Sequence, residues 1–123
     1  LKKVNQVIIK GVDNLPLNHS PNFKSEIWDN VHKGMRDAII SKIGTGKKAD
    51  PGTERFILFG KTGTAENPHG DNHAWFVGWA DYGDRKYSIV ILLENAGSGG
   101  AVAAPLARKV FNKLIINNDF VVR

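Results

Sequence analysis

Residues 56–66, FILFGKTGTAE, carry the strongest indication of how this chain folds and what chemistry it serves. Four bulky apolar residues, 56–59, run directly into Gly60-Lys61-Thr62-Gly63-Thr64. An apolar run of this length that ends in glycine is typical of a strand. Gly60-Lys61-Thr62 also resembles the end of a phosphate-binding loop, which requires a different local fold. The flanking sequence decides between the two interpretations.

A phosphate-binding loop is disfavoured by the residues on both sides of this tripeptide. The motif G-x-x-x-x-G-K-[ST] needs a glycine five positions before Gly60, where this chain has Arg55. The bulky residues after Arg55 favour an extended strand over a loop of amides curled around phosphates. Gly63 and Pro68 also oppose the helix that would have to begin after Thr62.

An amphipathic helix is predicted upstream of this strand. Its apolar positions recur at three- and four-residue steps, at Ile27, Val31, Met35, Ala38 and Ile39. Ser25 is expected to cap the helix and Gly44 to end it. We expect a short strand at 4–12, a loop at 14–22 and a mobile surface loop at 44–53.

Three strands are predicted after that loop, at 56–64, 74–80 and 87–94. Trp75, Val77 and Trp79 alternate along the second strand and should share one face. The third strand is apolar enough to predict burial on both faces. Residues 82–85 predict a hairpin turn, so the last two strands should be antiparallel neighbours.

A second amphipathic helix is predicted near the C-terminus, where a four-residue step links Val102, Leu106, Val110 and Leu114. Pro105 is tolerated there because it falls in the first turn. The order helix, three strands, helix predicts an α+β fold, with helices packed on a three-stranded antiparallel sheet.

Composition excludes several classes of function. Cysteine is absent, which excludes disulfides, thiolate catalysis and cysteine-based zinc sites. The net charge of +5 is spread over separate basic pairs, so we do not expect nucleic-acid binding. The longest apolar run, 89–93, is far short of the roughly 20 residues of a membrane-spanning helix. His69 and His73 lie on a loop without an evident third ligand, and no metal or cofactor is expected.

The Lys-Thr-Gly-Thr segment has a coherent chemistry if it lies on a strand. Thr62 and Thr64 would share one face and offer two hydroxyls to a substrate carboxylate. Lys61 would supply a positive charge, and Gly63 would leave room for a ligand backbone to lie against the strand. A substrate peptide could then pair with the strand edge.

The wider sequence resembles a known enzyme family. KTGTAE at 61–66 is followed by HAWFVGWA at 73–80, VILLEN at 90–95 and AAPLAR at 103–108. This succession resembles the C-terminal part of the transpeptidase domain of class B penicillin-binding proteins. The ending after residue 90 most resembles the elongation-type branch of that family, penicillin-binding protein 2. The match is dense in the second half of the chain and thin over residues 1–24.

The resemblance implies a serine-type D,D-transpeptidase that cross-links peptidoglycan stem peptides. In the family, a serine attacks the carbonyl between two terminal D-alanines, and β-lactams trap this serine because they mimic D-Ala-D-Ala. By motif position, Lys61 would be the electrostatic lysine, and the hydroxyls of Thr62 and Thr64 would hold the terminal carboxylate beside Gly63. The backbone N–H of Thr64 would be half of the oxyanion hole.

The nucleophile of that family is missing from this chain, because no serine is followed by a lysine three residues later. Ser20-Pro21-Asn22 matches the family's S-x-N element but lies too close to Lys61 in sequence. Residues 1–123 are therefore expected to be one partial domain, the C-terminal half, which is inactive alone. The resemblance implies that the parent lies on the periplasmic face of the membrane, anchored by a segment outside this chain.

Two further expectations follow from a partial domain. The family's sheet has additional strands, so the strand at 87–94 should have a free edge, and self-association is expected. The alternative to a transpeptidase fragment is a non-catalytic module that kept the motif to sense penicillin or peptides.

Overall fold

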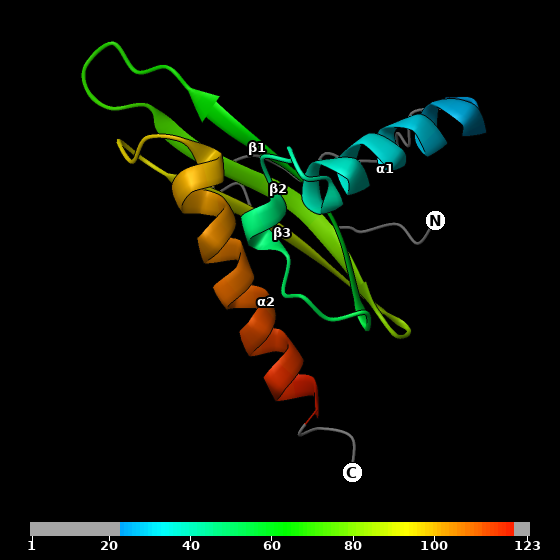
Figure 1. The fold of residues 1–123 in the computed structure, drawn as a ribbon. Helices are drawn as coiled ribbons and strands as arrows, with labels where there is room; N and C mark the ends of the chain where they lie inside the picture. The colour runs from blue at the N-terminus through cyan, green and yellow to red at the C-terminus, as the bar shows by residue number, and fades with distance from the viewer. Residues whose placement is uncertain (1–22, 120–123) are drawn as a thin grey trace, which may run out of the picture.

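The computed structural model describes residues 23–119, with side chains up to residue 117. The elements in order are α1 (Ser25–Ile40), η1 (Lys47–Ala49), β1 (Phe56–Ala65), β2 (His73–Tyr82), β3 (Arg85–Leu93), η2 (Gly99–Ala103) and α2 (Ala104–Asp119) (Figure 1). The strand expected at 4–12, the loop expected at 14–22 and the Ser20-Pro21-Asn22 element lie outside the described residues. Within the described residues, neither helix has the length and hydropathy needed to cross a bilayer.

The sheet confirms the predicted α+β class. Its order is β1-β2-β3, and both neighbouring pairs are antiparallel. Tyr82 pairs with Arg85 across the predicted hairpin, and Gly83 occupies the left-handed region there, with φ 61°. Each strand begins and ends within a few residues of its predicted range, because the alternation of side chains and the turn residues are both local signals.

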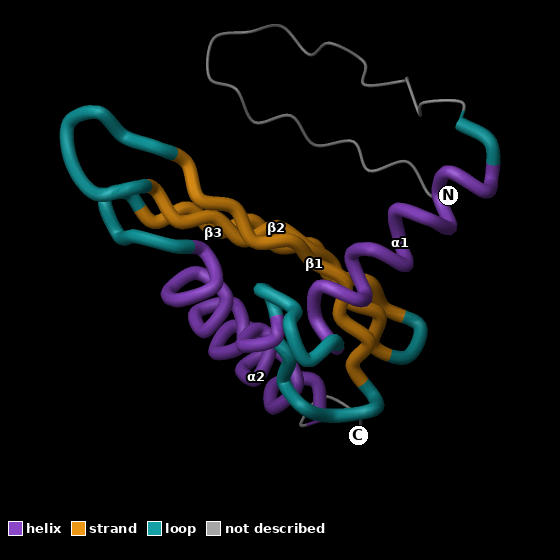
Figure 2. The backbone as a smooth tube through the Cα atoms, turned by 45° about the horizontal axis from the view of Figure 1, so that its top comes forward, coloured by secondary structure: helices purple, strands orange, loops and turns teal. Residues whose placement is uncertain are grey.

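The helices lie in two different places relative to the sheet. Figure 2 shows α2 along one side of the sheet and α1 beside β1. The core lies between α2 and the sheet, and its fully buried members include Leu58, Phe76, Ala107 and Phe111. On the opposite face, His32 of α1 contacts Trp79, with ring centroids 5.1 Å apart.

The third strand corrects one prediction. Residues 87–94 were expected to be buried on both faces, but β3 buries only the face towards α2, where Ile91 lies. Val90 and Leu92 point the other way and are 68% and 42% exposed. An apolar run cannot by itself indicate which of its faces is covered, because that depends on the other elements present.

Both helices bury a different surface from the predicted one. In α2 the fully buried positions are Ala104, Ala107 and Phe111, whereas Leu106 and Val110 remain exposed. A helix repeats every 3.6 residues, so a strict four-residue stripe winds away from the contact. The small alanines instead allow α2 to approach the sheet closely. In α1, Ile39 is the one fully buried residue of the predicted stripe, while Ile27 and Val31 are exposed.

The ends of α1 and the segment after it also differ from the prediction. Lys24, not Ser25, is the N-cap, and it makes no side-chain capping bond. The helix ends at Ile40, before Gly44. Residues 44–53, expected to form a surface loop, include η1, in which Ala49 is completely buried. The lysines and glycines of this segment indicate an exposed loop. Its burial could not be predicted from them, because η1 packs on α2 through Ala49, its one apolar residue.

Gly99 fixes how closely η2 lies against the sheet. A Cβ on Gly99 would be 2.3 Å from the carbonyl oxygen of Trp75 and 2.4 Å from that of Gly63. Both atoms belong to strand backbones, which cannot move aside as a side-chain end can. Only glycine therefore allows η2 to start on top of the motif strand.

Candidate functional site

The predicted motif lies on the edge strand of the sheet. Residues 61–64 form the C-terminal part of β1, which pairs with β2 on one side only. Lys61 lies opposite Val77, and Thr64 lies opposite Ala74. The motif therefore has one edge in the ladder and one edge free among the described residues, as a strand that receives an extended ligand requires.

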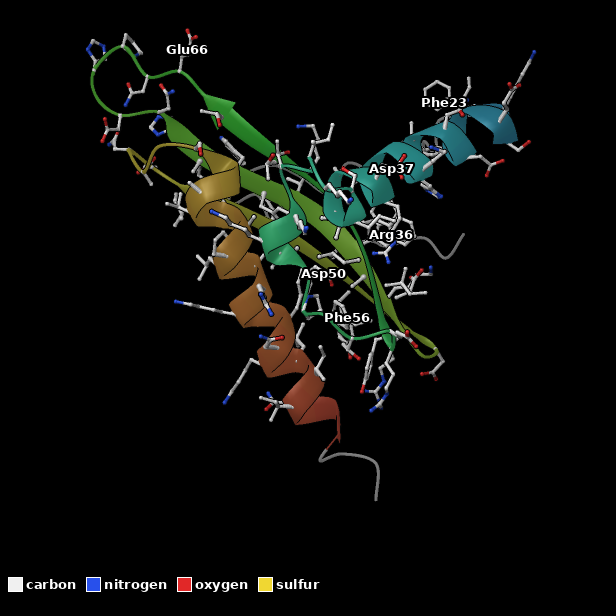
Figure 3. The ribbon with its side chains drawn as sticks, in the orientation of Figure 1. Phe23, Arg36, Asp37, Asp50, Phe56 and Glu66 are labelled. Atoms are coloured by element: carbon white, nitrogen blue, oxygen red, sulfur yellow. The ribbon has the colours of Figure 1, made fainter. Side chains whose placement is uncertain are left out.

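Two hydrogen bonds show which backbone groups of β1 face the free edge. The carbonyl oxygen of Leu58 accepts a bond of 2.9 Å from Nη1 of Arg36. Arg36 is labelled on α1 in Figure 3. The carbonyl oxygen of Thr62 accepts a bond of 2.6 Å from Lys61 Nζ. In an antiparallel strand, the N–H and C=O of one residue point to the same side, and alternate residues share that side. The N–H of Thr64 therefore points to the free edge as well.

Lys61 places its charge at this same edge. Its side chain leaves the sheet on the face opposite α2, is exposed, and turns back to donate to the Thr62 carbonyl. An ammonium bonded to a single neutral acceptor keeps two donors for another partner. The backbone N–H of Thr64 and the ammonium of Lys61 thus lie along one edge and are both suited to an anionic or developing negative charge.

The two threonine hydroxyls differ in accessibility. Thr62 is only 7% exposed, and its Oγ1 lies 2.7 Å from Oγ1 of Thr45, in the turn after α1. Thr64 is exposed, and its Oγ1 accepts a bond of 3.4 Å from the N–H of Gly99. Both side chains share one face of β1, as predicted, but that face is the one covered by η2 and Thr45.

Gly63 lies between them in close contact with the second strand. A Cβ on Gly63 would be 3.2 Å from Cβ of Trp75, its cross-strand partner. Because Gly63 has no side chain, nothing projects from β1 at this point on the sheet face opposite α2. Gly63 therefore permits a close approach from that face, as the sequence interpretation required.

Sequence reasoning missed two residues around the motif, Thr45 and Asn95. Thr45 binds Thr62, and its only local signal was its place in a Gly-Thr-Gly turn at 44–46. Asn95, after β3, is bonded to His73 at the start of β2 and to Asn67 in the loop after β1. Asparagine is one of the few residues that adopts a left-handed backbone, so its place at a strand end was the available signal.

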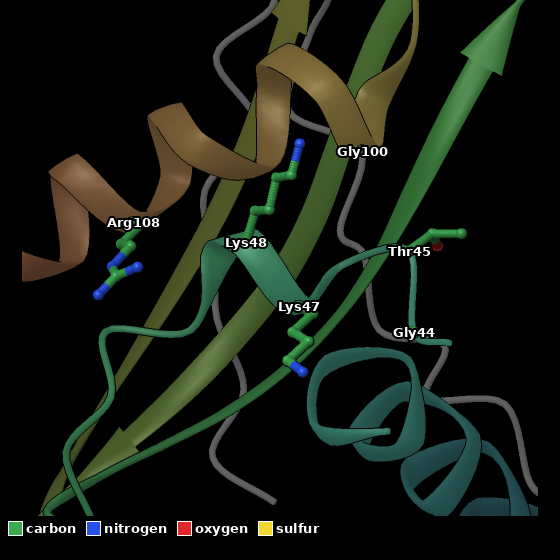
Figure 4. Close-up of a pocket in the computed structure, with 6 residues that line it drawn as sticks. All are labelled: Gly44, Thr45, Lys47, Lys48, Gly100 and Arg108. Atoms are coloured by element: carbon green, nitrogen blue, oxygen red, sulfur yellow. The ribbon is translucent and has the colours of Figure 1, made fainter. Parts of the chain in front are cut away.

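An open pocket of about 550 Å³ lies on the α2 side of the motif strand, beside Thr45. Its lining comprises Gly44, Thr45, Lys47, Lys48, Gly100 and Arg108. Figure 4 shows that the side chains of Lys47 and Lys48 extend in opposite directions, so their charges do not converge. The free edge of β1, not this pocket, brings together the groups predicted from the motif.

The chain combines an edge strand that carries Lys-Thr-Gly-Thr, two further antiparallel strands and a C-terminal helix. The sequence model of the penicillin binding protein transpeptidase domain matches residues 2–112. The chain belongs to this transpeptidase-domain family.

Relatives within the family point to one branch. Peptidoglycan D,D-transpeptidase MrdA of Haemophilus influenzae is 36% identical over an alignment 104 positions long, which covers 72% of this chain and 16% of MrdA. MrdA of Salmonella typhimurium is 40% identical over an alignment 105 positions long, which covers 73% of this chain and 17% of that protein. The transpeptidase-domain chain described here thus spans about a sixth of the length of these relatives.

Solved structures agree with this assignment. Pseudomonas aeruginosa PBP2, in complex with WCK 5153, superposes with a TM-score of 0.62 at 32% identity, covering 74% of this chain and 20% of that one. PBP2 in a complex with MreC from Helicobacter pylori gives a TM-score of 0.56 at 27% identity, covering 75% and 18%. The predicted resemblance to a PBP2-type transpeptidase domain is confirmed.

Proposed function

We propose that this chain is the C-terminal half of a transpeptidase domain and forms the Lys-Thr-Gly wall of a peptidoglycan D,D-transpeptidase site. The observation that carries the proposal is the free edge of β1. There the N–H of Thr64 points away from the sheet, next to the ammonium of Lys61. The relatives named peptidoglycan D,D-transpeptidase MrdA support the same reaction class.

The proposed mechanism uses a serine supplied by the other half of the domain. That serine attacks the carbonyl of a D-Ala-D-Ala stem peptide, and the carbonyl oxygen becomes negative in the tetrahedral intermediate. The N–H of Thr64 donates to this oxygen, which lowers the barrier because the donor is fixed before reaction. D-alanine leaves, and an amine of a neighbouring strand resolves the acyl-serine. None of these steps requires a cofactor.

The remaining motif residues bind the substrate in this proposal. Lys61 attracts the terminal carboxylate, and Gly63 leaves room for the peptide backbone. The exposed hydroxyl of Thr64 can reach a carboxylate directly. The hydroxyl of Thr62 donates to Thr45, so it must give up this bond before it can donate to a ligand. β-Lactams occupy the same edge as mimics of D-Ala-D-Ala, and the parent acts on the periplasmic face of the membrane, where its substrate is.

The proposal is tested by mass spectrometry of the full-length gene product after exposure to a fluorescent penicillin. We expect one covalent adduct on a serine outside residues 1–123, abolished when that serine is replaced by alanine. The 123-residue chain alone should remain unmodified. An adduct on the isolated chain would show that it contains its own nucleophile. Reversible binding by the full-length protein, without any adduct, would favour the non-catalytic sensing module.

We also propose that the isolated chain self-associates through β3. This strand has an unpaired edge among the described residues, and Val90 is 68% exposed beside it. An exposed apolar edge readily pairs with another chain, and a lysine on that edge opposes pairing. Val90→Lys should therefore lower the mass measured by light scattering towards that of a monomer. Val31→Lys, on the exposed side of α1, is the control and should not. A monodisperse wild-type monomer would contradict self-association.

A further inference from the structure

Asn95 has an unusual backbone conformation close to the motif. It follows β3 directly, has φ 51°, and is the single non-glycine residue with positive φ among the described residues. A left-handed backbone costs an L-amino acid roughly 1–2 kcal/mol, least for asparagine and aspartate. Such strain persists only where the surrounding structure enforces it, and it is concentrated at functional sites.

Two hydrogen bonds enforce this conformation. The backbone N–H of Asn95 donates to Nδ1 of His73, at 3.0 Å. Its side-chain Oδ1 accepts from Nδ2 of Asn67, at 2.5 Å. His73 begins β2, and Asn67 lies in the loop that leaves β1. Asn95 thus binds both ends of the β1–β2 loop at once.

The loop held by Asn95 begins immediately after the motif. His73 is the cross-strand partner of Ala65, the residue that follows Thr64. Asn67 is only two residues further along the chain. Three peptide units join Asn67 to Thr64, and one joins Thr64 to Ala65, the partner of His73, so a movement at either residue can shift Thr64.

The chain after Asn95 reaches Thr64 a second time. The N–H groups of Ala96 and Gly97 both donate to the Asn72 carbonyl, at 3.0 and 2.9 Å. Two residues later the N–H of Gly99 donates to Oγ1 of Thr64. The segment from Asn95 to Gly99 therefore binds both the loop that follows the motif and the side chain of Thr64 itself.

We infer that Asn95 is a positioning residue for the acyl-transfer step, which fixes the direction of the Thr64 N–H through Asn67 and His73. This inference rests on the proposed function, because it gives Thr64 the role of oxyanion donor. Preorganised donors stabilise a transition state only when they are held in place before the reaction. Asn95 itself need not touch the substrate.

The test compares two substitutions of Asn95 in the full-length gene product. Asn95→Gly keeps the left-handed backbone accessible and deletes the bond to Asn67. Asn95→Asp keeps both an oxygen acceptor and tolerance of this conformation. We expect Asn95→Gly to slow the acylation step by a β-lactam by about tenfold, the size of one lost hydrogen bond. The prior non-covalent binding constant should change little, and Asn95→Asp should restore most of the rate.

Asn67→Asp provides a matched partner variant. It removes the donor to Asn95 but keeps Oδ1, which accepts from the backbone N–H of His69 at 3.0 Å. If both changes break the same bond, the double variant with Asn95→Gly should be no slower than either single variant. Additive losses would overturn the assignment.

Hydrogen exchange over residues 63–67 separates positioning from general stability. Asn95→Gly should accelerate exchange at Ala65, whose N–H faces β2, while the core of β2 stays protected. Unchanged exchange and unchanged acylation, or a uniform loss of protection with a lowered Tm, would overturn the inference. If the wild-type protein takes up no β-lactam, the proposed function fails, and exchange at Ala65 alone decides whether Asn95 holds the loop.

Discussion

Replacing Gly99 by alanine is expected to lower the free energy of unfolding of this chain by about 3 kcal/mol or more, the upper range for overpacking. The added Cβ would lie 2.3 Å from the Trp75 carbonyl oxygen and 2.4 Å from the Gly63 carbonyl oxygen. Relief requires η2 to leave the sheet, and α2 with it, which exposes Ala104 and Ala107. Urea denaturation followed by circular dichroism, at low protein concentration, measures the change.

Gly34→Ala is the matched control for this prediction. Gly34 lies within α1 (Ser25–Ile40), and nothing would approach its added Cβ within 4 Å. Alanine is the better helix former, so the free energy of unfolding should rise by about 0.5–1 kcal/mol. The same chemical change is thus expected to have opposite signs at the two sites. A Gly99→Ala midpoint equal to that of the wild type would show that η2 is not held against β1 and β2.

The second large effect is expected when the amide nitrogen of Thr64 is replaced by an ester oxygen in the full-length protein. This change deletes the N–H and leaves the side chain intact. If Thr64 is an oxyanion donor, the rate of acylation by a β-lactam should fall about 10²–10³-fold. The sheet should remain folded, because this N–H points to the free edge and not to β2.

The control for the ester substitution is Gly60, four residues earlier on β1. By the alternation of the strand, its N–H also points away from β2, but it is outside the motif. An ester at Gly60 should leave acylation within the experimental error of the wild type. Equal losses at both positions would attribute the effect to the strand edge as a whole and contradict a specific role for Thr64.

The sheet could be predicted from the sequence because its determinants are local. Alternation in β2 and the turn at Gly83 set the strands and their antiparallel order. The buried surface of α2 could not be predicted in this way. Leu106 and Val110 are more apolar than Ala104 and Ala107, yet the alanines are buried because they allow close packing on the sheet. Which side of a helix is covered depends on the shape of its partner.

The candidate site also has a part that could be predicted from the sequence and a part that could not. The motif identified Lys61 and Thr64, and the fold places the charge of one and the N–H of the other at the same edge of β1, while their catalytic roles stay a prediction. The orientation of Thr62 towards Thr45 could not be predicted, because it depends on a contact between residues seventeen positions apart. Asn95 was missed for the same reason, since its two partners lie on other segments and only the folded chain brings them together.

The small buried residues of η2 and α2 influence the position of the candidate site. Ala103 at the end of η2 and Ala104 and Ala107 in α2 are all completely buried, so the size of these methyl groups sets the spacing between this segment and the core on which it packs. Gly99 is the first residue of the same segment, and its N–H donates to Oγ1 of Thr64, so a change in that spacing would also move this bond. A larger side chain in place of any of these alanines would tilt α2. The tilt would move η2, which lies over the motif strand, although the substituted residue would not contact the motif itself.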